Sequence, residues 1–171
     1  MSFFTQLSEL LLTPVQLAIQ ALFLLSLFES GRLVVQWALR WRGRRGFRTP
    51  AAGGFGALGG GYPLARRYAD DPALTLDELD VAAMKQLELI RVATRVTPML
   101  GLIATLIPMG PALVALTRND VAQMSELLRS AFAAVVLALA AACLCFWIAS
   151  VRRRWCAEEL VAVKRRIEAR P

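Results

Sequence analysis

The chain has 171 residues, of which 57% are hydrophobic, and its formal net charge at pH 7 is +7. A mean hydropathy of +0.51 is high for a soluble domain and favours a protein embedded in lipid. Because the sequence contains no histidine, Ser/His/Asp and Cys/His catalysis and the usual zinc sites are excluded, and we predict no enzyme activity, no metal and no cofactor.

Residues 14–41 form the first predicted membrane helix. They are apolar apart from a few polar positions, and they exceed the ~20 residues that cross ~30 Å of hydrocarbon. Thr13, Pro14 and Gln16 match a capping box with proline at the first helical position, so the helix is expected to begin there. Residues 1–13 are then a segment on the outer side.

The end of this first helix carries the signals of a membrane interface. Trp37 and Trp41 form an aromatic belt, and a basic cluster accompanies them: Arg40, Arg42, Arg44 and Arg45. Glu29 and Arg32 are three residues apart, hence on one face, and are predicted to form an ion pair. A role of this pair in proton exit is the alternative.

The middle of the chain contains a predicted linker followed by a predicted amphipathic helix. Residues 42–75 are rich in Gly, Pro and Arg and predict a cytoplasmic linker, with one helical turn near 64–68. Thr75 and Glu78 then form a capping box at the start of an amphipathic helix, residues 76–95. Its apolar positions recur every three or four residues: Leu76, Leu79, Ala83, Leu87, Ile90 and Ala93.

Two further membrane helices follow. Residues 96–116 contain no charge, and 117–124 are a short outer loop in which Asp120 marks a helix start. The third membrane helix is expected at 125–150, and its helix can continue through the cytoplasmic tail, 151–171.

The basic residues set the predicted orientation. All lysines and arginines except Arg32, Arg118 and Arg129 lie at the end of the first helix, in the linker, in the amphipathic helix or in the tail. The positive-inside rule therefore predicts an all-α membrane protein with three transmembrane helices, the amino terminus outside and the carboxyl terminus inside. The second and third helices extend into the cytoplasm. The basic clusters are expected to contact anionic lipids, and no motif supports a nucleic-acid partner.

Small or kinking residues crowd one side of the second membrane helix, where neighbouring backbones can approach closely. The predicted helix-packing residues are Pro98, Gly101, Ala104 and Pro108, joined on the third helix by Ala138. Close packing alone would explain this pattern. On the third helix, a small-xxx-small row is suited to contact between subunits: Ser130, Ala134, Ala138 and Ala142.

The stretch TPMLGLIATLIPMGPAL, entered from a basic amphipathic helix, resembles the second membrane helix of the MotA/TolQ/ExbB proton-channel family, whose pattern is roughly P-x-x-G-L-x-G-T-x-x-G. The order of parts along the whole chain is similar as well, while the motif is specific over residues 95–113. Ala104 replaces the second glycine of the pattern. The matching residues are Pro98, Gly101, Leu102 and Thr105.

The resemblance implies a ring-forming subunit of a proton-motive-force-driven energy-transducing or motor complex in a bacterial or archaeal cytoplasmic (inner) membrane. In that family five copies surround the membrane helices of an ExbD/TolR/MotB-like single-span partner, which supplies the proton-binding Asp. The pore-lining residue is then Thr105. Its hydroxyl can donate to a carboxylate or accept from a carboxylic acid, although it could instead bond a carbonyl of its own helix.

One departure from the family leaves two hypotheses open. The family has a second threonine on the third helix, and the resemblance implies that Ala134 occupies that place in the pathway here. The chain is therefore either a conducting transducer or a non-conducting membrane scaffold of the same fold.

Overall fold

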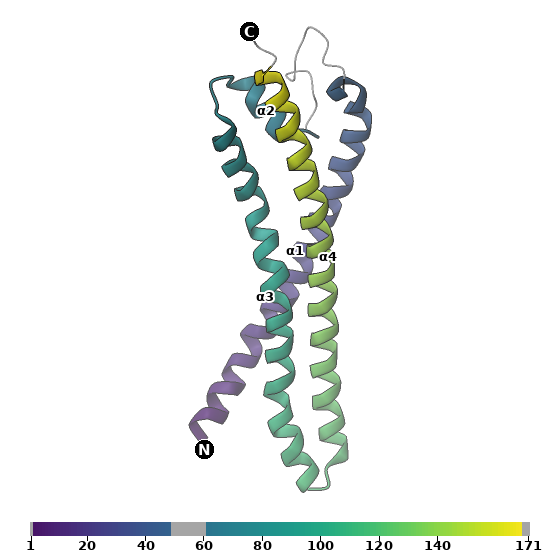
Figure 1. Ribbon diagram of the computed structural model, residues 1–171. Helices are drawn as coiled ribbons and strands as arrows, with labels where there is room; N and C mark the ends of the chain where they lie inside the picture. The colour runs from purple at the N-terminus through teal and green to yellow at the C-terminus, as the bar shows by residue number, and fades with distance from the viewer. Residues whose placement is uncertain (1, 49–60, 169–171) are drawn as a thin grey trace. The chain divides into compact units, whose positions relative to one another are not determined.

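The computed structural model of the protein describes residues 2–48 and 61–168. Within these ranges the chain forms helices and short connections, without a strand (Figure 1). The helices are α1 (Ser2–Arg48), α2 (Pro63–Asp70), α3 (Leu76–Thr117) and α4 (Val121–Glu168). α1, α3 and α4 each contain a segment long and apolar enough to cross a membrane. The predicted all-α class with three membrane helices is confirmed, and its orientation remains a prediction.

α1 begins earlier than the sequence predicted. It runs without interruption from Ser2 and carries Pro14 inside the helix, so the expected start at the capping box of Thr13 is wrong. An interior proline removes one hydrogen bond. In an apolar chain, ending the helix there would instead expose several backbone groups to lipid, which costs more.

α3 joins the predicted amphipathic helix and the second apolar segment in one continuous helix, although Pro98, Pro108 and Pro111 all lie inside it. Its predicted capping box is confirmed. The Glu78 amide donates to Thr75 Oγ1 at 3.3 Å, and the Thr75 amide donates to Glu78 Oε2 at 2.9 Å. The hydrogen bond from the Thr75 backbone, and then that from its hydroxyl, lower the pKa of the Glu78 carboxyl.

The connection between α3 and α4 is a tight turn. Asn119 adopts φ 56°, in the left-handed region that asparagine tolerates better than most residues. Asp120 Oδ1 then accepts a hydrogen bond from the Gln123 amide at 3.0 Å, which confirms the predicted helix start. α4 continues into the tail, as expected.

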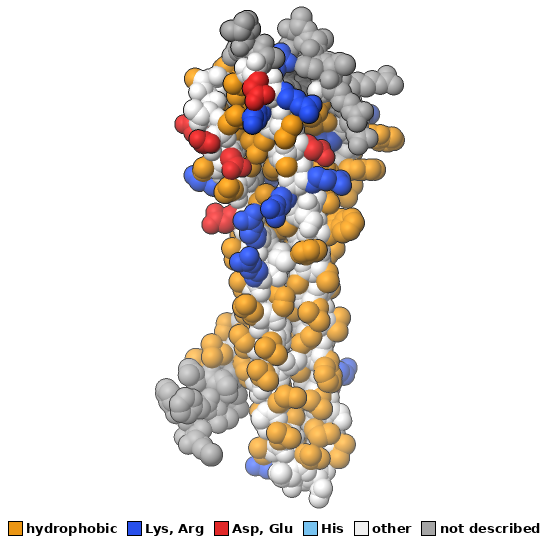
Figure 2. Space-filling view, viewed as in Figure 1, with side chains coloured by type: hydrophobic (Ala, Val, Ile, Leu, Met, Phe, Trp, Pro, Cys, Tyr) orange, Lys and Arg blue, Asp and Glu red, His pale blue; other side chains and the backbone are white. Residues whose placement is uncertain are grey.

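The chain divides into two compact units, Met1–Phe28 with Arg91–Phe146, and Glu29–Ile90 with Trp147–Pro171. In the first unit, α3 and α4 run side by side in opposite directions (Figure 1). Its core joins all three long helices: Val15 and Ile19 of α1, Ala104 of α3, and Ala134 and Ala138 of α4. The visible surface of this unit is mostly hydrophobic (Figure 2), as expected for helices that face lipid or other membrane helices.

The second unit carries most of the charged side chains (Figure 2) and is organised around α2. One cluster joins α2 to α3 and α4: Tyr62, Ala65, Tyr68, Leu79 and Val163. The turn expected near 64–68 is therefore confirmed as a helix, and it is a core element. Residues 49–60 of the predicted linker lie outside the described residues.

Cysteine labelling tests the orientation. In a background with Cys143, Cys145 and Cys156 replaced by alanine, Asn119→Cys should react with an impermeant maleimide in intact spheroplasts. Asp70→Cys should react only after permeabilisation. Both positions are exposed. The reverse pattern would overturn the predicted orientation.

Candidate functional site

The first unit brings the predicted packing residues together. Gly101 of α3 faces Ala138 of α4 so closely that a Cβ placed on Gly101 would lie 2.9 Å from the Ala138 Cβ. Ala104 and Pro108 are also buried, and Pro98 is half-buried. The small residues thus allow close approach of α3 and α4 inside one chain.

Most of the small-residue row of α4 packs inside the chain. Ala134, Ala138 and Ala142 are all buried within the chain, whereas Ser130 is exposed and donates to the Leu127 carbonyl at 2.9 Å. The chain's own helices already cover the three alanines. The three alanines therefore pack within the chain, and a contact of this row with a neighbouring subunit remains a prediction.

The two predicted pore residues differ in exposure. Thr105 is half-buried, and its hydroxyl donates to the Leu102 carbonyl of the same helix at 2.8 Å. This local bond is the alternative that the sequence left open, formed with the residue three positions back. Ala134 is only 8% exposed and packs in the core with Val15 and Ile19. Of the two, Thr105 is the one that reaches the surface of the chain.

The second unit contains a buried ionic network that the sequence did not predict. Arg40 of α1 donates from Nη2 to Glu159 Oε1 of α4, and these residues are 7% and 0% exposed. Glu159 Oε2 accepts hydrogen bonds from the amides of Leu64 at 2.8 Å and Ala65 at 3.1 Å. One carboxylate therefore connects α4 both to α1 and to the positive, amino-terminal end of α2.

Aromatic rings enclose the Arg40 guanidinium. Its central carbon lies 4.6 Å from the Tyr62 ring centroid and 4.6 Å from the Trp155 ring centroid. Such contacts stabilise a desolvated cation. The sequence grouped Arg40 with the arginines exposed at the membrane surface, whereas Arg40 is buried within the chain. The sequence did contain a signal for this position. Glu29, Arg32, Gln36 and Arg40 follow one another at intervals of three, four and four residues, which places Arg40 on the same helical face as the ion pair.

The predicted ion pair of Glu29 and Arg32 is confirmed, with Glu29 Oε1 and Arg32 Nη1 2.9 Å apart. A third member, Arg152 of α4, was not predicted. Its Nη2 lies 2.6 Å from Glu29 Oε2, close enough for strong charge attraction but without the alignment of a hydrogen bond. Glu29 therefore bridges two arginines from different helices.

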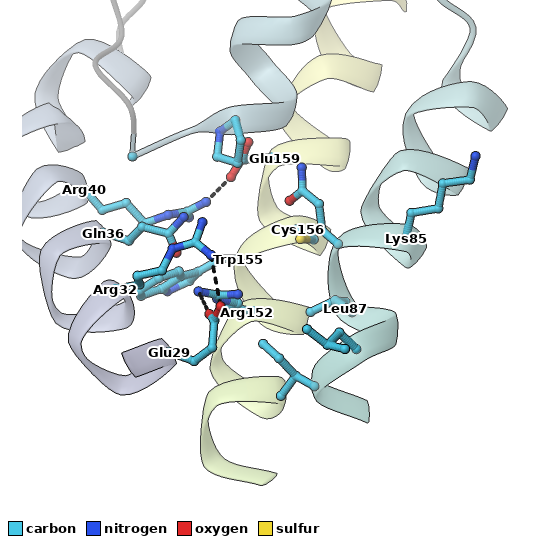
Figure 3. A pocket seen from close by; sticks show the side chains of 15 residues that line it. Glu29, Arg32, Gln36, Arg40, Lys85, Leu87, Arg152, Trp155, Cys156 and Glu159 are labelled. Carbon is cyan, nitrogen blue, oxygen red and sulfur yellow. Dashed lines mark hydrogen bonds and ion pairs between the residues drawn. The ribbon is translucent and has the colours of Figure 1, made fainter. Parts of the chain in front are cut away.

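These charged groups line one cavity of about 430 Å³ (Figure 3). Its walls come from α1, the start of α2, α3 and α4, and they include Glu29, Arg32, Arg40, Lys85, Arg152 and Glu159. Within the described ranges, no group of His, Cys, Asp or Glu residues could hold a metal ion. The cavity is instead dominated by cations.

Comparison with known proteins identifies one family. A model of the MotA/TolQ/ExbB proton channel family matches residues 72–165, which is more than half of the chain and includes Thr105 and Ala134. No curated protein and no solved structure matches the chain significantly. The matched region begins after α1 and α2, so Arg40 lies outside it.

Proposed function

Because this chain belongs to the MotA/TolQ/ExbB proton channel family, we propose that several copies form a ring that transduces the proton-motive force. By resemblance the ring has five subunits, sits in the cytoplasmic membrane of a bacterium or archaeon with the amino termini outside, and surrounds a single-span partner. The partner supplies a proton-binding Asp. α3 presents Thr105 to that carboxyl group.

The exposure of Thr105 is the observation that carries this proposal. Of the two hydroxyl side chains in residues 96–116, Thr97 is fully buried and donates to the Ala93 carbonyl, whereas Thr105 reaches the surface. Its neighbours Leu102 and Leu106 are exposed and apolar. A partner Asp that faces this part of α3 would therefore find its hydrogen-bonding group at Thr105.

The Thr105 hydroxyl suits both protonation states of such a carboxyl group. While its hydrogen is donated to the Leu102 carbonyl, the oxygen can still accept a hydrogen bond from a carboxylic acid. Rotation about the C–O bond would let the same hydroxyl donate to a carboxylate. Moving one charge through 100 mV supplies about 2.3 kcal/mol. That exceeds the ~0.6 to ~1.7 kcal/mol of a hydrogen bond in a membrane.

A second candidate function is a non-conducting scaffold. By resemblance, Ala134 takes the place of the family's second threonine, and it has no hydrogen-bonding side-chain group. Its burial against Val15 and Ile19 also separates it from any partner helix on the subunit surface. This observation favours assembly without a complete polar pathway.

Thr105→Val tests the proposed function because it keeps the side-chain shape and removes the hydroxyl. Proton flux into liposomes that contain the chain and its single-span partner should fall about 3- to 16-fold, the equivalent of one membrane hydrogen bond. Assembly, followed by native mass spectrometry, should be unchanged. Thr117→Val is the matched control, since Thr117 makes the same type of bond to a carbonyl three residues back, at the end of α3.

Two results would contradict the proposal. A monomer in the unmodified protein would exclude a ring. If the unmodified complex carries no flux, and neither Thr105→Val nor Ala134→Thr changes this, the scaffold takes the place of the transducer.

A further inference from the structure

The cavity in the second unit carries an excess of positive charge. Four cationic side chains line it, and two carboxylates accompany them: Arg32, Arg40, Lys85 and Arg152, with Glu29 and Glu159. The lining therefore has two net positive charges. Both carboxylates are already committed, Glu29 to two arginines and Glu159 to Arg40 and the start of α2.

Buried donors in this lining have no acceptor in the described part of the chain. Arg40 is 7% exposed and its Nε–H lacks a hydrogen-bond partner. The Nε–H of Arg152 lacks one too. A buried donor left unsatisfied costs about 1–3 kcal/mol, and more when it is charged. In the described part of the chain, both guanidinium groups therefore keep a donor that can bind a further acceptor.

The shape and chemistry of the cavity narrow the class of ligand. Arginines from α1 and α4 converge on it (Figure 3), and their planar forks match the oxygens of a phosphate group. A volume of about 430 Å³ far exceeds the ~30 Å³ that one water occupies. There is room for a tetrahedral anion and for a substituent attached to it.

We propose that this cavity binds a phosphate-class anion, either free phosphate or the headgroup of an anionic phospholipid, through Arg32, Arg40 and Arg152, with Lys85 at its rim. The bound anion connects α1 to α4 and neutralises the excess charge between them. Trp37 and Trp41, stacked 6.1 Å apart on α1, are residues typical of the headgroup level, where such lipids are available. This binding is independent of proton conduction.

Two variants remove a cation without disturbing the buried network. The Arg32 side chain is 56% exposed, and Glu29 keeps Arg152 as a partner in Arg32→Gln. Lys85 is exposed, so Lys85→Gln should also fold normally. The matched controls are Arg42→Gln on α1 and Arg91→Gln on α3, because both residues are exposed and neither lines the cavity.

The experiment uses the full chain, delipidated in a neutral detergent. Inorganic phosphate is titrated by calorimetry. Retention of phosphatidylglycerol, against phosphatidylcholine with the same acyl chains, is measured by native mass spectrometry. Arg32→Gln should weaken binding about tenfold, the loss of one charge-assisted hydrogen bond. Lys85→Gln should weaken it a few-fold, and both controls should bind as the unmodified chain does.

The probes distinguish the sources of the anion. Variant-sensitive binding of phosphatidylglycerol without phosphate identifies a lipid headgroup, and the converse identifies free phosphate. Binding of both shows that the phosphate group itself is recognised. The proposal is overturned if neither probe binds, or if the control variants lose as much affinity as Arg32→Gln does.

Discussion

Glu159→Gln should destabilise the protein by about 3 to 5 kcal/mol, the usual cost of removing one partner of a buried ion pair. The substitution leaves the buried Arg40 cation without its main counter-charge. In the unmodified protein, one carboxylate oxygen of Glu159 accepts from Arg40 and the other accepts from the amides of Leu64 and Ala65. Glutamine keeps only one acceptor oxygen, so one of these two sets of hydrogen bonds is lost. The start of α2 should therefore loosen along with the contact between α1 and α4.

Chemical unfolding in detergent measures the loss of stability, and amide hydrogen exchange locates it. Protection should fall first at Leu64 and Ala65, because Glu159 accepts from their N–H groups. Glu158→Gln is the control. Glu158 is the next residue, its side chain is 56% exposed, and it lies 4.0 Å from Arg40. Its replacement should change stability by about 0.5 kcal/mol or less.

A second substitution separates loss of the pair from loss of packing. Arg40→Met in the Glu159→Gln background removes the uncompensated cation, so the double variant should be more stable than Glu159→Gln alone. If Glu159→Gln unfolds at the same denaturant concentration as Glu158→Gln, the network has no stabilising role.

Local sequence signals predicted most of the helices correctly. The capping box of Thr75 and Glu78, the helix start at Asp120 and the pair of Glu29 and Arg32 each join residues three positions apart or closer. Such contacts follow from helix geometry alone. The incorrect start of α1 had the same local origin. Pro14 matched the pattern of a first-turn proline, but the apolar residues on both sides of it form one continuous helix.

The ionic network could not be predicted in this way because its partners are distant in sequence. Arg40 and Glu159 are 119 residues apart, and their contact depends on the register of α1 against α4. The surrounding arginines made Arg40 resemble a headgroup anchor, and only burial between Tyr62 and Trp155 distinguishes it. The small-residue row of α4 shows the same limit, since a pattern of alanines predicts close packing but not which helix provides the partner.

Gly101→Ala should destabilise the first unit by about 1 to 3 kcal/mol, the usual cost of overpacking a core. Two effects compete. Alanine in place of glycine favours a helix by about 1 kcal/mol. The new Cβ would lie 2.9 Å from the Ala138 Cβ and 3.9 Å from the Val135 Cα, and neither of these atoms belongs to a flexible side-chain end. Because α3 and α4 must move apart to admit it, the packing cost should exceed the gain.

Gly110→Ala is the matched control, since Gly110 lies on the same helix and a Cβ there meets nothing within 4 Å. That variant should keep or raise stability, by up to about 1 kcal/mol. Ala138→Gly in the Gly101→Ala background removes the atom that clashes, and should recover much of the loss even though a second glycine weakens α4. Thermal unfolding in one detergent ranks the stabilities of the unmodified chain, the two single glycine variants and the double variant. If Gly101→Ala is as stable as Gly110→Ala, then α3 and α4 do not pack closely at Gly101, and the small residues of α3 would be free to contact another subunit.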